Sequence, residues 1–135
     1  MPKVFLDTNI LFSAILLPNS IPDLALQKAL SSPFTAMTAD YCLEELKNKF
    51  AKKFPYKIEA LNRFIQEIIL VIEVVEISTT ERQEEQLIRD VKDRPILRAA
   101  IEQNADILIT GDKDFLESSI TKPKIIKASD FYFSY

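Results

Sequence analysis

The sequence contains no histidine, no tryptophan and a single glycine, Gly111, among its 135 residues. Without histidine, the chain cannot build a Ser-His-Asp or Cys-His catalytic group or a histidine-ligated zinc site. With one glycine, it cannot contain the GxGxxG dinucleotide loop or the GxxxxGK[ST] phosphate loop. Any chemistry must therefore use carboxylates, hydroxyls, amides, lysines and a bound metal ion.

Cysteine and long apolar runs are also scarce. Cys42 is the only cysteine, so no disulfide can form within the chain, and we interpret Cys42 as a small buried apolar residue. Asp7 and Asn9 interrupt the apolar N-terminal segment, and the run that follows them is too short to span a bilayer. We therefore expect a cytoplasmic protein that does not associate with a membrane.

The composition that is present is typical of a globular protein, with 47% hydrophobic and 27% charged residues and no internal repeat. A chain of this length buries about two thirds of the surface that it exposes when unfolded. It is too short for two domains of ordinary size. We therefore expect residues 1–135 to form a single domain.

Short apolar segments alternate with helical patterns along the chain. We predict strands at residues 4–6, 34–37, 71–77, 107–110 and 125–128. We predict helices at residues 9–17, 20–31, 40–53, 55–68, 81–89 and 95–103, with Asn9 capping the first. Strands separated by helices need crossover connections. The predicted fold class is therefore α/β, with a central, mainly parallel sheet between two layers of helices.

Two acidic residues lie close to the ends of predicted strands. Asp7 follows residues 4–6, and Asp112 follows residues 107–110 and Gly111. Ligands of open parallel sheets bind outside the carboxyl ends of the strands, so we expect these carboxylates to meet. We also expect Gly111 to adopt a backbone angle that other residues resist, which would turn Asp112 toward the crevice. Taken singly, each acid is best interpreted as an ordinary loop or cap residue, and it is the presence of two acids at two strand ends that favours a site.

Two further acids belong to predicted helices. Asp93 precedes Pro95 by two residues and is a candidate N-cap, which alone would explain it. Glu45 borders an apolar helical stripe, whereas Glu44 points more toward solvent. That stripe consists of Cys42, Leu43, Leu46 and Phe50. Because a glutamate on an amphipathic helix usually lies on its solvated face, Glu45 gains weight only from its neighbours.

Four segments together resemble the PIN-domain family of nucleases. They are KVFLDTNIL at residues 3–11, DYCLEEL at 40–46, RDVKDRPIL at 89–97 and ILITGDKDF at 107–115. Their order and spacing match the family along essentially the whole chain. The RD-x-x-D-x-x-I-L arrangement further resembles the toxin component of type II toxin-antitoxin pairs, although that subgroup often has an acid where Lys92 stands.

The resemblance implies a metal-dependent endoribonuclease with a three-layer α/β/α fold. The catalytic acids that it implies are Asp7, Glu45, Asp93 and Asp112. The metal ligands that it implies are Asp7, Asp93, Asp112 and Asp114, with supporting roles for Thr8, Asn9 and Thr110. Glu44 remains an alternative. We prefer Glu45 because it is the glutamate that leucine follows and because it borders the apolar stripe. The expected partners are RNA, a cognate antitoxin protein and further copies of the chain.

The chemistry of such a site also follows from its charges. Several carboxylates in one crevice repel each other and take up protons unless a cation neutralises them. Oxygen ligands favour magnesium or manganese, which would polarise a phosphodiester and lower the pKa of a bound water. The alternative is a catalytically silent PIN-like binding module, which a metal-binding assay would distinguish.

The net charge of −3 is unusual for a protein that binds nucleic acid. Positive charge is nevertheless concentrated just after Glu45. The residues that carry it are Lys47, Lys49, Lys52, Lys53 and Lys57. Taken alone, this segment is typical of a solvated helix face. Beside the acids, we expect it to contact the RNA backbone.

Overall fold

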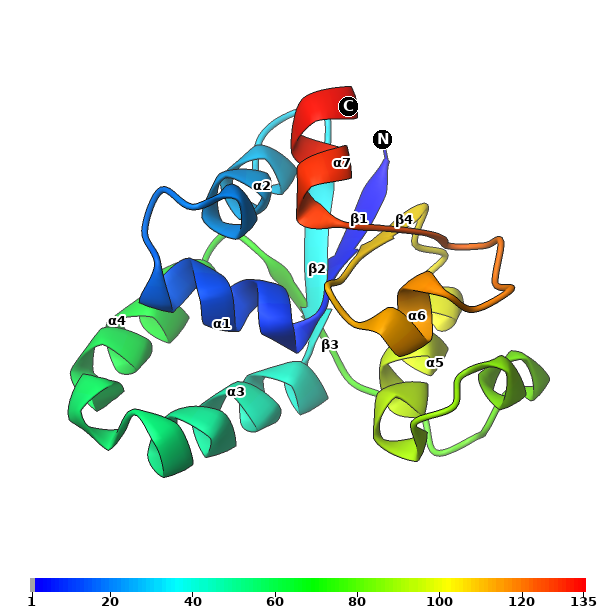
Figure 1. Ribbon diagram of the computed structural model, residues 1–135, viewed down its shortest axis with the longest axis horizontal. Coiled ribbons are helices and arrows are strands. Elements are labelled where there is room, and N and C mark those ends of the chain that lie inside the picture. Colours follow the sequence, from blue (N-terminus) through cyan, green and yellow to red (C-terminus); the bar gives the residue numbers. More distant parts are fainter. Residues whose placement is uncertain (1) are drawn as a thin grey trace.

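The computed structural model describes residues 2–135 and has a five-stranded sheet at its centre (Figure 1). The strands are β1 (Lys3–Leu6), β2 (Thr35–Ala39), β3 (Glu73–Val75), β4 (Ile107–Ile109) and β5 (Lys124–Ile126). All neighbouring strands pair in parallel, in the order β3-β2-β1-β4-β5. The predicted α/β fold with a central parallel sheet is confirmed.

Helices cover both faces of the sheet. They are α1 (Thr8–Leu16), α2 (Ile21–Ala29), α3 (Asp40–Lys53), α4 (Ile58–Ile68), α5 (Arg94–Glu102), α6 (Lys113–Leu116) and α7 (Ala128–Ser134). Three short 3₁₀ helices are η1 (Pro55–Lys57), η2 (Gln83–Leu87) and η3 (Val91–Asp93). Within residues 2–135, no single helix is long and apolar enough to cross a bilayer. Helices α1 and α2 have that length and apolar character only when taken as a pair, and this pair is bent by 117°.

The central strand β1 supplies side chains to two separate hydrophobic clusters. Val4 and Leu6 pack with residues of α1, α2, α4 and α7 on one face, whereas Phe5 packs with residues of α5 and α6 on the other. Successive side chains of a strand point to opposite faces, so an uninterrupted apolar run is what a strand buried on both sides requires. Helix α3 contributes to both clusters, and its Cys42 is fully buried, as interpreted from the sequence.

Some element boundaries differ from those predicted. Strand β5 ends at Ile126, and Ala128 begins α7 rather than ending the strand. The reason is tertiary, because Ala128 and Phe131 are buried and Lys28 of α2 donates hydrogen bonds to the carbonyls of Phe131 (3.3 Å) and Tyr132 (2.9 Å). The expected helix over 81–89 is only the 3₁₀ helix η2, and the strand expected over 71–77 is shortened to β3.

A buried ion pair holds η2 against α5. Arg98 donates two hydrogen bonds to the Glu85 carboxylate, at 2.9 and 2.8 Å, and a third to the carbonyl of Ser78 at 2.7 Å. Glu85 is 3% exposed and Arg98 is 9% exposed. Arg94 also donates to the carbonyl of Ile88 at 2.9 Å. Two arginines of α5 therefore fasten the segment that leads into η3.

Candidate active site

The chain leaves the neighbouring strands β1 and β4 toward opposite edges of the sheet. From β1 the chain continues through α1 and α2 to β2 on one side, and from β4 it continues through α6 to β5 on the other. Such a switch point leaves a crevice at the carboxyl ends of the two strands. Leu6 pairs with Ile109, so Asp7 and Asp112, which follow these strand ends, lie at this crevice.

Asp7 directly follows β1, is 3% exposed and accepts three hydrogen bonds. Its Oδ1 accepts a hydrogen bond from the backbone N–H of Thr8 (2.7 Å), which makes Asp7 the cap of α1 instead of the predicted Asn9. Its Oδ2 accepts from the hydroxyl of Thr110 (2.7 Å) and the amide of Asn9 (3.3 Å). Burial raises the pKa of Asp7 to about 6 despite these donors, and the charges of Glu45 and Asp112 add to the rise.

Glu45 reaches the same crevice from α3. Its Oε1 accepts a hydrogen bond from the hydroxyl of Thr8 at 2.6 Å, next to Asp7. Glu44 is instead exposed and lies 3.8 Å from Lys47. One helical turn beyond Glu45, the ammonium of Lys49 lies 5.6 Å from the centre of the Phe12 ring. The face of α3 that carries Glu45 and Lys49 is therefore the face turned toward α1.

Asp93 and Asp112 lie close to each other and near Asp7. Burial raises the pKa of Asp93 to about 8, as do a hydrogen bond with Asp112 and the charges of Asp112 and Asp7. Although Asp93 precedes α5 as predicted, its side chain makes no capping hydrogen bond, and its buried Oδ2 has no partner among residues 2–135. Asp112 accepts from the backbone N–H of Asp114 at 2.8 Å. The Asp93 carboxyl thus needs either a proton or a cation.

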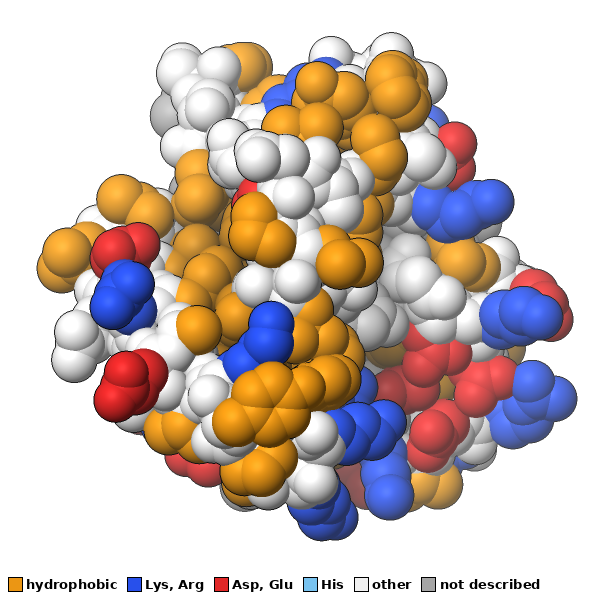
Figure 2. Space-filling model, turned by 60° about the vertical axis from the view of Figure 1, so that its left-hand side comes forward, with side chains coloured by type: hydrophobic (Ala, Val, Ile, Leu, Met, Phe, Trp, Pro, Cys, Tyr) orange, Lys and Arg blue, Asp and Glu red, His pale blue; other side chains and the backbone are white. Residues whose placement is uncertain are grey.

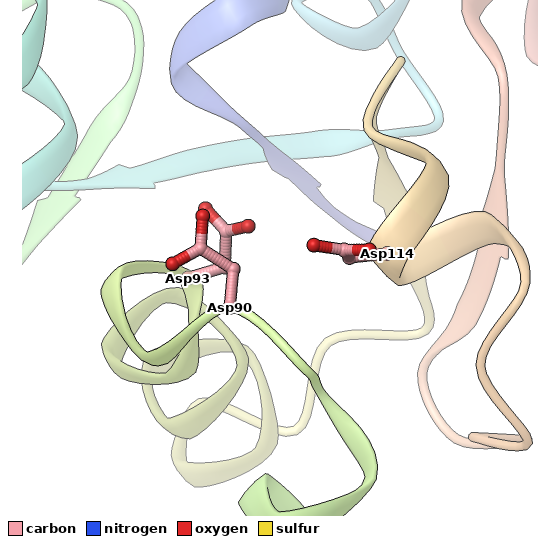
Figure 3. A group of neighbouring side chains, drawn as sticks. All are labelled: Asp90, Asp93 and Asp114. Carbon is pink, nitrogen blue, oxygen red and sulfur yellow. The ribbon is translucent and has the colours of Figure 1, made fainter.

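Among residues 2–135, the group of three acids close enough together to share one ion includes the predicted ligands Asp93 and Asp114 but neither Asp7 nor Asp112. Carboxylate oxygens of Asp90, Asp93 and Asp114 lie within 4.8 Å of one another. Figure 3 shows Asp90 and Asp93 side by side at the start of the α5 segment, with Asp114 facing them from α6. Asp114 also accepts hydrogen bonds from Nε (3.1 Å) and Nη2 of Arg89. The sequence interpretation missed Asp90 and Arg89, although an acid three residues before Asp93 was a usable signal.

Gly111 does not have the conformational role expected from the sequence. The φ angle of Gly111 is not positive, so residues with a side chain could adopt the same backbone conformation. The Gly111 N–H donates to Oδ1 of Asn9 at 3.2 Å, and the Asp112 N–H donates to the hydroxyl of Thr110 at 3.0 Å. These hydrogen bonds to side chains, rather than an unusual backbone angle, orient Asp112.

The donor set fits a hard divalent cation. Every candidate ligand is a carboxylate oxygen, which suits magnesium or manganese and is a poor match for zinc or copper. Burial raises the pKa of Asp7 and Asp93, and the buried Oδ2 of Asp93 has no hydrogen-bond partner among residues 2–135, so these carboxylates lack compensating charge when they ionise. A bound cation would provide that compensation.

A family model for the PIN domain matches residues 3–114. The chain belongs to the PIN-domain family. An uncharacterized protein of Methanocaldococcus jannaschii is 29% identical to this PIN domain over 114 residues, which cover 84% of this chain and 73% of that protein.

Solved structures share the fold of this PIN domain. VapBC2 from Rickettsia felis, bound to a DNA fragment from their promoter, has a TM-score of 0.71 and 20% identity and covers 93% of this chain and 98% of that chain. Mycobacterium tuberculosis VapC20, a sarcin-ricin loop cleaving toxin, matches with a TM-score of 0.60 and 16% identity. The match covers 84% of this chain and 93% of the VapC20 chain. The α/β/α architecture of these proteins is thus the architecture of this one.

We expect the metal-free PIN domain to lose stability as the pH rises from about 4 to about 8. In this window Asp7 and Asp93, with pKa values near 6 and 8, hold protons in the folded state that they release when unfolded. The free energy of unfolding therefore falls with increasing pH. Because a cation displaces the same protons, its affinity should rise over this window.

Denaturant unfolding at several pH values, with EDTA and with magnesium, measures both effects. Asp93→Asn is the informative variant, since it removes the carboxyl with the higher pKa. An identical pH dependence for wild type and Asp93→Asn would contradict the assignment.

Proposed function

We propose that this PIN domain is a divalent-metal-dependent endoribonuclease that hydrolyses RNA phosphodiester bonds and is the toxin of a toxin-antitoxin pair. The observation that carries the proposal is the group of carboxylates at the strand ends, in which the buried Oδ2 of Asp93 has no partner. Membership of the PIN-domain family supports a nuclease. The shared fold of VapC20, a toxin that cleaves the sarcin-ricin loop, is consistent with RNA as the substrate.

In this proposal Asp7, Asp93 and Asp112 hold the cation, and Asp114 joins them when Arg89 moves away. When bound, the cation supplies the charge that neutralises the phosphodiester and lowers the pKa of the attacking water. Thr8 and Thr110 keep the carboxylates of Glu45 and Asp7 in place through hydrogen bonds of 2.6 and 2.7 Å. Oε2 of Glu45 accepts no hydrogen bond within residues 2–135 and is available to take a proton from that water.

The test is cleavage of one labelled RNA, and of DNA with the same sequence, in magnesium, in manganese and in EDTA. We expect metal-dependent cleavage of RNA only. Glu45→Gln should abolish it, whereas Glu44→Gln, a matched change on the adjacent residue, should leave it intact. Metal binding without cleavage of any RNA would instead identify a catalytically silent module, and failure to bind metal would overturn the proposal.

We propose that the cognate antitoxin covers the apolar face of α1 and α4. Partly exposed hydrophobic side chains on this face are Phe12, Ile15, Leu16, Ile58 and Ile65. Figure 2 shows hydrophobic side chains gathered where α1, α3 and α4 come forward. Leu17 and Tyr56, at its margins, are 62% and 76% exposed. Ile15→Asp should therefore prevent purification of a complex with the antitoxin while leaving RNA cleavage unchanged.

We expect the lysines of α3 to bind RNA phosphates. Lys49 lies one turn beyond Glu45 on the face turned toward α1, and Lys52 is exposed further along the helix. Removing one lysine that binds a phosphate should reduce the slope of log affinity against log salt by about one. RNA binding by Asp7→Asn, with and without Lys49→Ala and Lys52→Ala, measures this slope. As a control, Lys122→Ala combined with Lys124→Ala removes the same amount of charge at the β5 edge of the sheet. If this control lowered the salt slope as much as Lys49→Ala with Lys52→Ala, the lysines of α3 would not be a specific RNA-binding site.

A further inference from the structure

The only glycine of the chain serves neither backbone conformation nor packing. Gly111 has no positive φ, so a residue with a side chain could adopt its conformation. A Cβ atom placed there would have one neighbour within 4 Å, Oδ1 of Asn9, at 3.9 Å. Neither the backbone torsion angles nor a steric clash therefore requires glycine at position 111. The missing side chain leaves open space above an exposed stretch of backbone. Glycine also serves where a ligand approaches the backbone closely.

That open space belongs to a groove of about 420 Å³ beside the acidic crevice. The groove shares Asn9, Thr110 and Gly111 with the crevice, and the first two donate hydrogen bonds to Asp7. A volume of this size falls in the range of sites for small ligands such as a single nucleotide, about 300–1,000 Å³. A ligand in the groove would therefore lie directly beside the carboxylates.

The walls of the groove offer two kinds of contact. Ile10, Ile21 and Pro22 provide apolar surface for the face of a base, while Ser13 and Ser129 provide hydroxyls for a sugar or a base edge. Lys127, at the rim, is exposed and takes part in none of the ion pairs found among residues 2–135. A free cation next to a crevice of carboxylates favours a ligand that carries phosphate.

We propose that this groove binds the nucleotide adjoining the scissile phosphate of a single-stranded RNA. Lys127 contacts the next phosphate along the strand, and the bare backbone at Gly111 admits the sugar-phosphate chain. The proposal rests on the nuclease function proposed above and adds to it a second RNA contact region, separate from the lysines of α3. The RNA then crosses the acidic crevice between the lysines of α3 and Lys127.

The test is binding of a fluorescent single-stranded RNA of mixed sequence, in magnesium, by the non-cleaving Asp93→Asn protein. Adding Gly111→Val should weaken binding about tenfold, as expected when a contact surface is overfilled. Adding Lys127→Ala should weaken binding and lower the salt slope by about one. Lys122→Ala, a matched control at the amino end of β5, whereas Lys127 follows its carboxyl end, should change neither. Melting temperature and magnesium affinity should be the same in all of these variants.

The outcomes separate this proposal from the nuclease function. If wild type cleaves RNA but Gly111→Val and Lys127→Ala bind it as tightly as their parent, the groove proposal is wrong. If these changes instead weaken only the complex with the antitoxin, the groove belongs to a protein segment, and the proposal is also overturned. A wild-type protein that neither binds nor cleaves RNA would refute the proposed function itself. Should Gly111→Val fail to fold, Lys127→Ala and Ser129→Ala still decide the question.

Discussion

Replacing Asp7 with asparagine is expected to remove most of the stabilisation by magnesium and to slow RNA cleavage by roughly 10³-fold or more. A cation at about 100 times its dissociation constant stabilises the folded state by about 2.7 kcal/mol, which raises the melting temperature of a domain of this size by roughly 10 °C. Asp7 is buried at the centre of the acids and touches Thr8, Asn9 and Thr110, so losing its charge should affect metal binding more than the fold.

Thermal unfolding with and without magnesium measures this shift. Asp112→Asn should behave like Asp7→Asn, because the two carboxylates follow adjacent strands at the same crevice. Glu44→Gln is the control, since Glu44 is exposed and paired with Lys47. A metal-induced shift of wild-type size in both Asp7→Asn and Asp112→Asn would show that the ion binds elsewhere.

Replacing Arg98 with alanine is expected to destabilise the protein by about 3–5 kcal/mol, since it leaves a buried charge unpaired. Glu85 is 3% exposed, and Arg98 supplies two of its hydrogen bonds at 2.8 and 2.9 Å. The hydrogen bonds from Arg98 lower the pKa of Glu85, so the pair stabilises the fold above the ordinary pKa of a glutamate and loses this effect in acid. The destabilisation by Arg98→Ala should therefore shrink as the pH is lowered.

Denaturant unfolding of two further variants tests the cause. Arg98→Met combined with Glu85→Leu removes both charges and should recover most of the stability. Arg89→Ala breaks an ion pair with Asp114, but the Arg89 side chain is 83% exposed, so little change is expected. If Arg98→Ala were no less stable than Arg89→Ala at neutral pH, the buried pair would not be what holds η2 on α5.

Local pattern was enough to predict the main features of the fold. Apolar runs followed by helical stripes required crossover connections, and these require parallel strands. The same pattern placed Asp7 and Asp112 just after strands β1 and β4, which are adjacent in the sheet. It also favoured Glu45 over Glu44, because a helix places residues near its apolar stripe toward its neighbours. Each of these inferences depends only on residues within a few positions of each other.

The remaining features depended on contacts between distant parts of the chain. Helix α7 exists where a strand was expected, because α2 buries Ala128 and Phe131. The pairing of Arg89 with Asp114 and the nearness of Asp90 arise where η3 meets α6. Gly111 proved to have an ordinary backbone conformation, which spacing could not reveal.

The sequence by itself determined which acids this protein has and at which end of the sheet they lie, because strand and helix periodicity is local. Only the tertiary structure decided how strongly these acids interact. The hydrogen bond from Thr110 to Asp7 spans 103 residues, and the pKa of Asp93 depends on its burial and on Asp112. Burial and charge proximity are properties of the packed chain, since the energy of a carboxylate depends on which groups surround it and how much water they exclude.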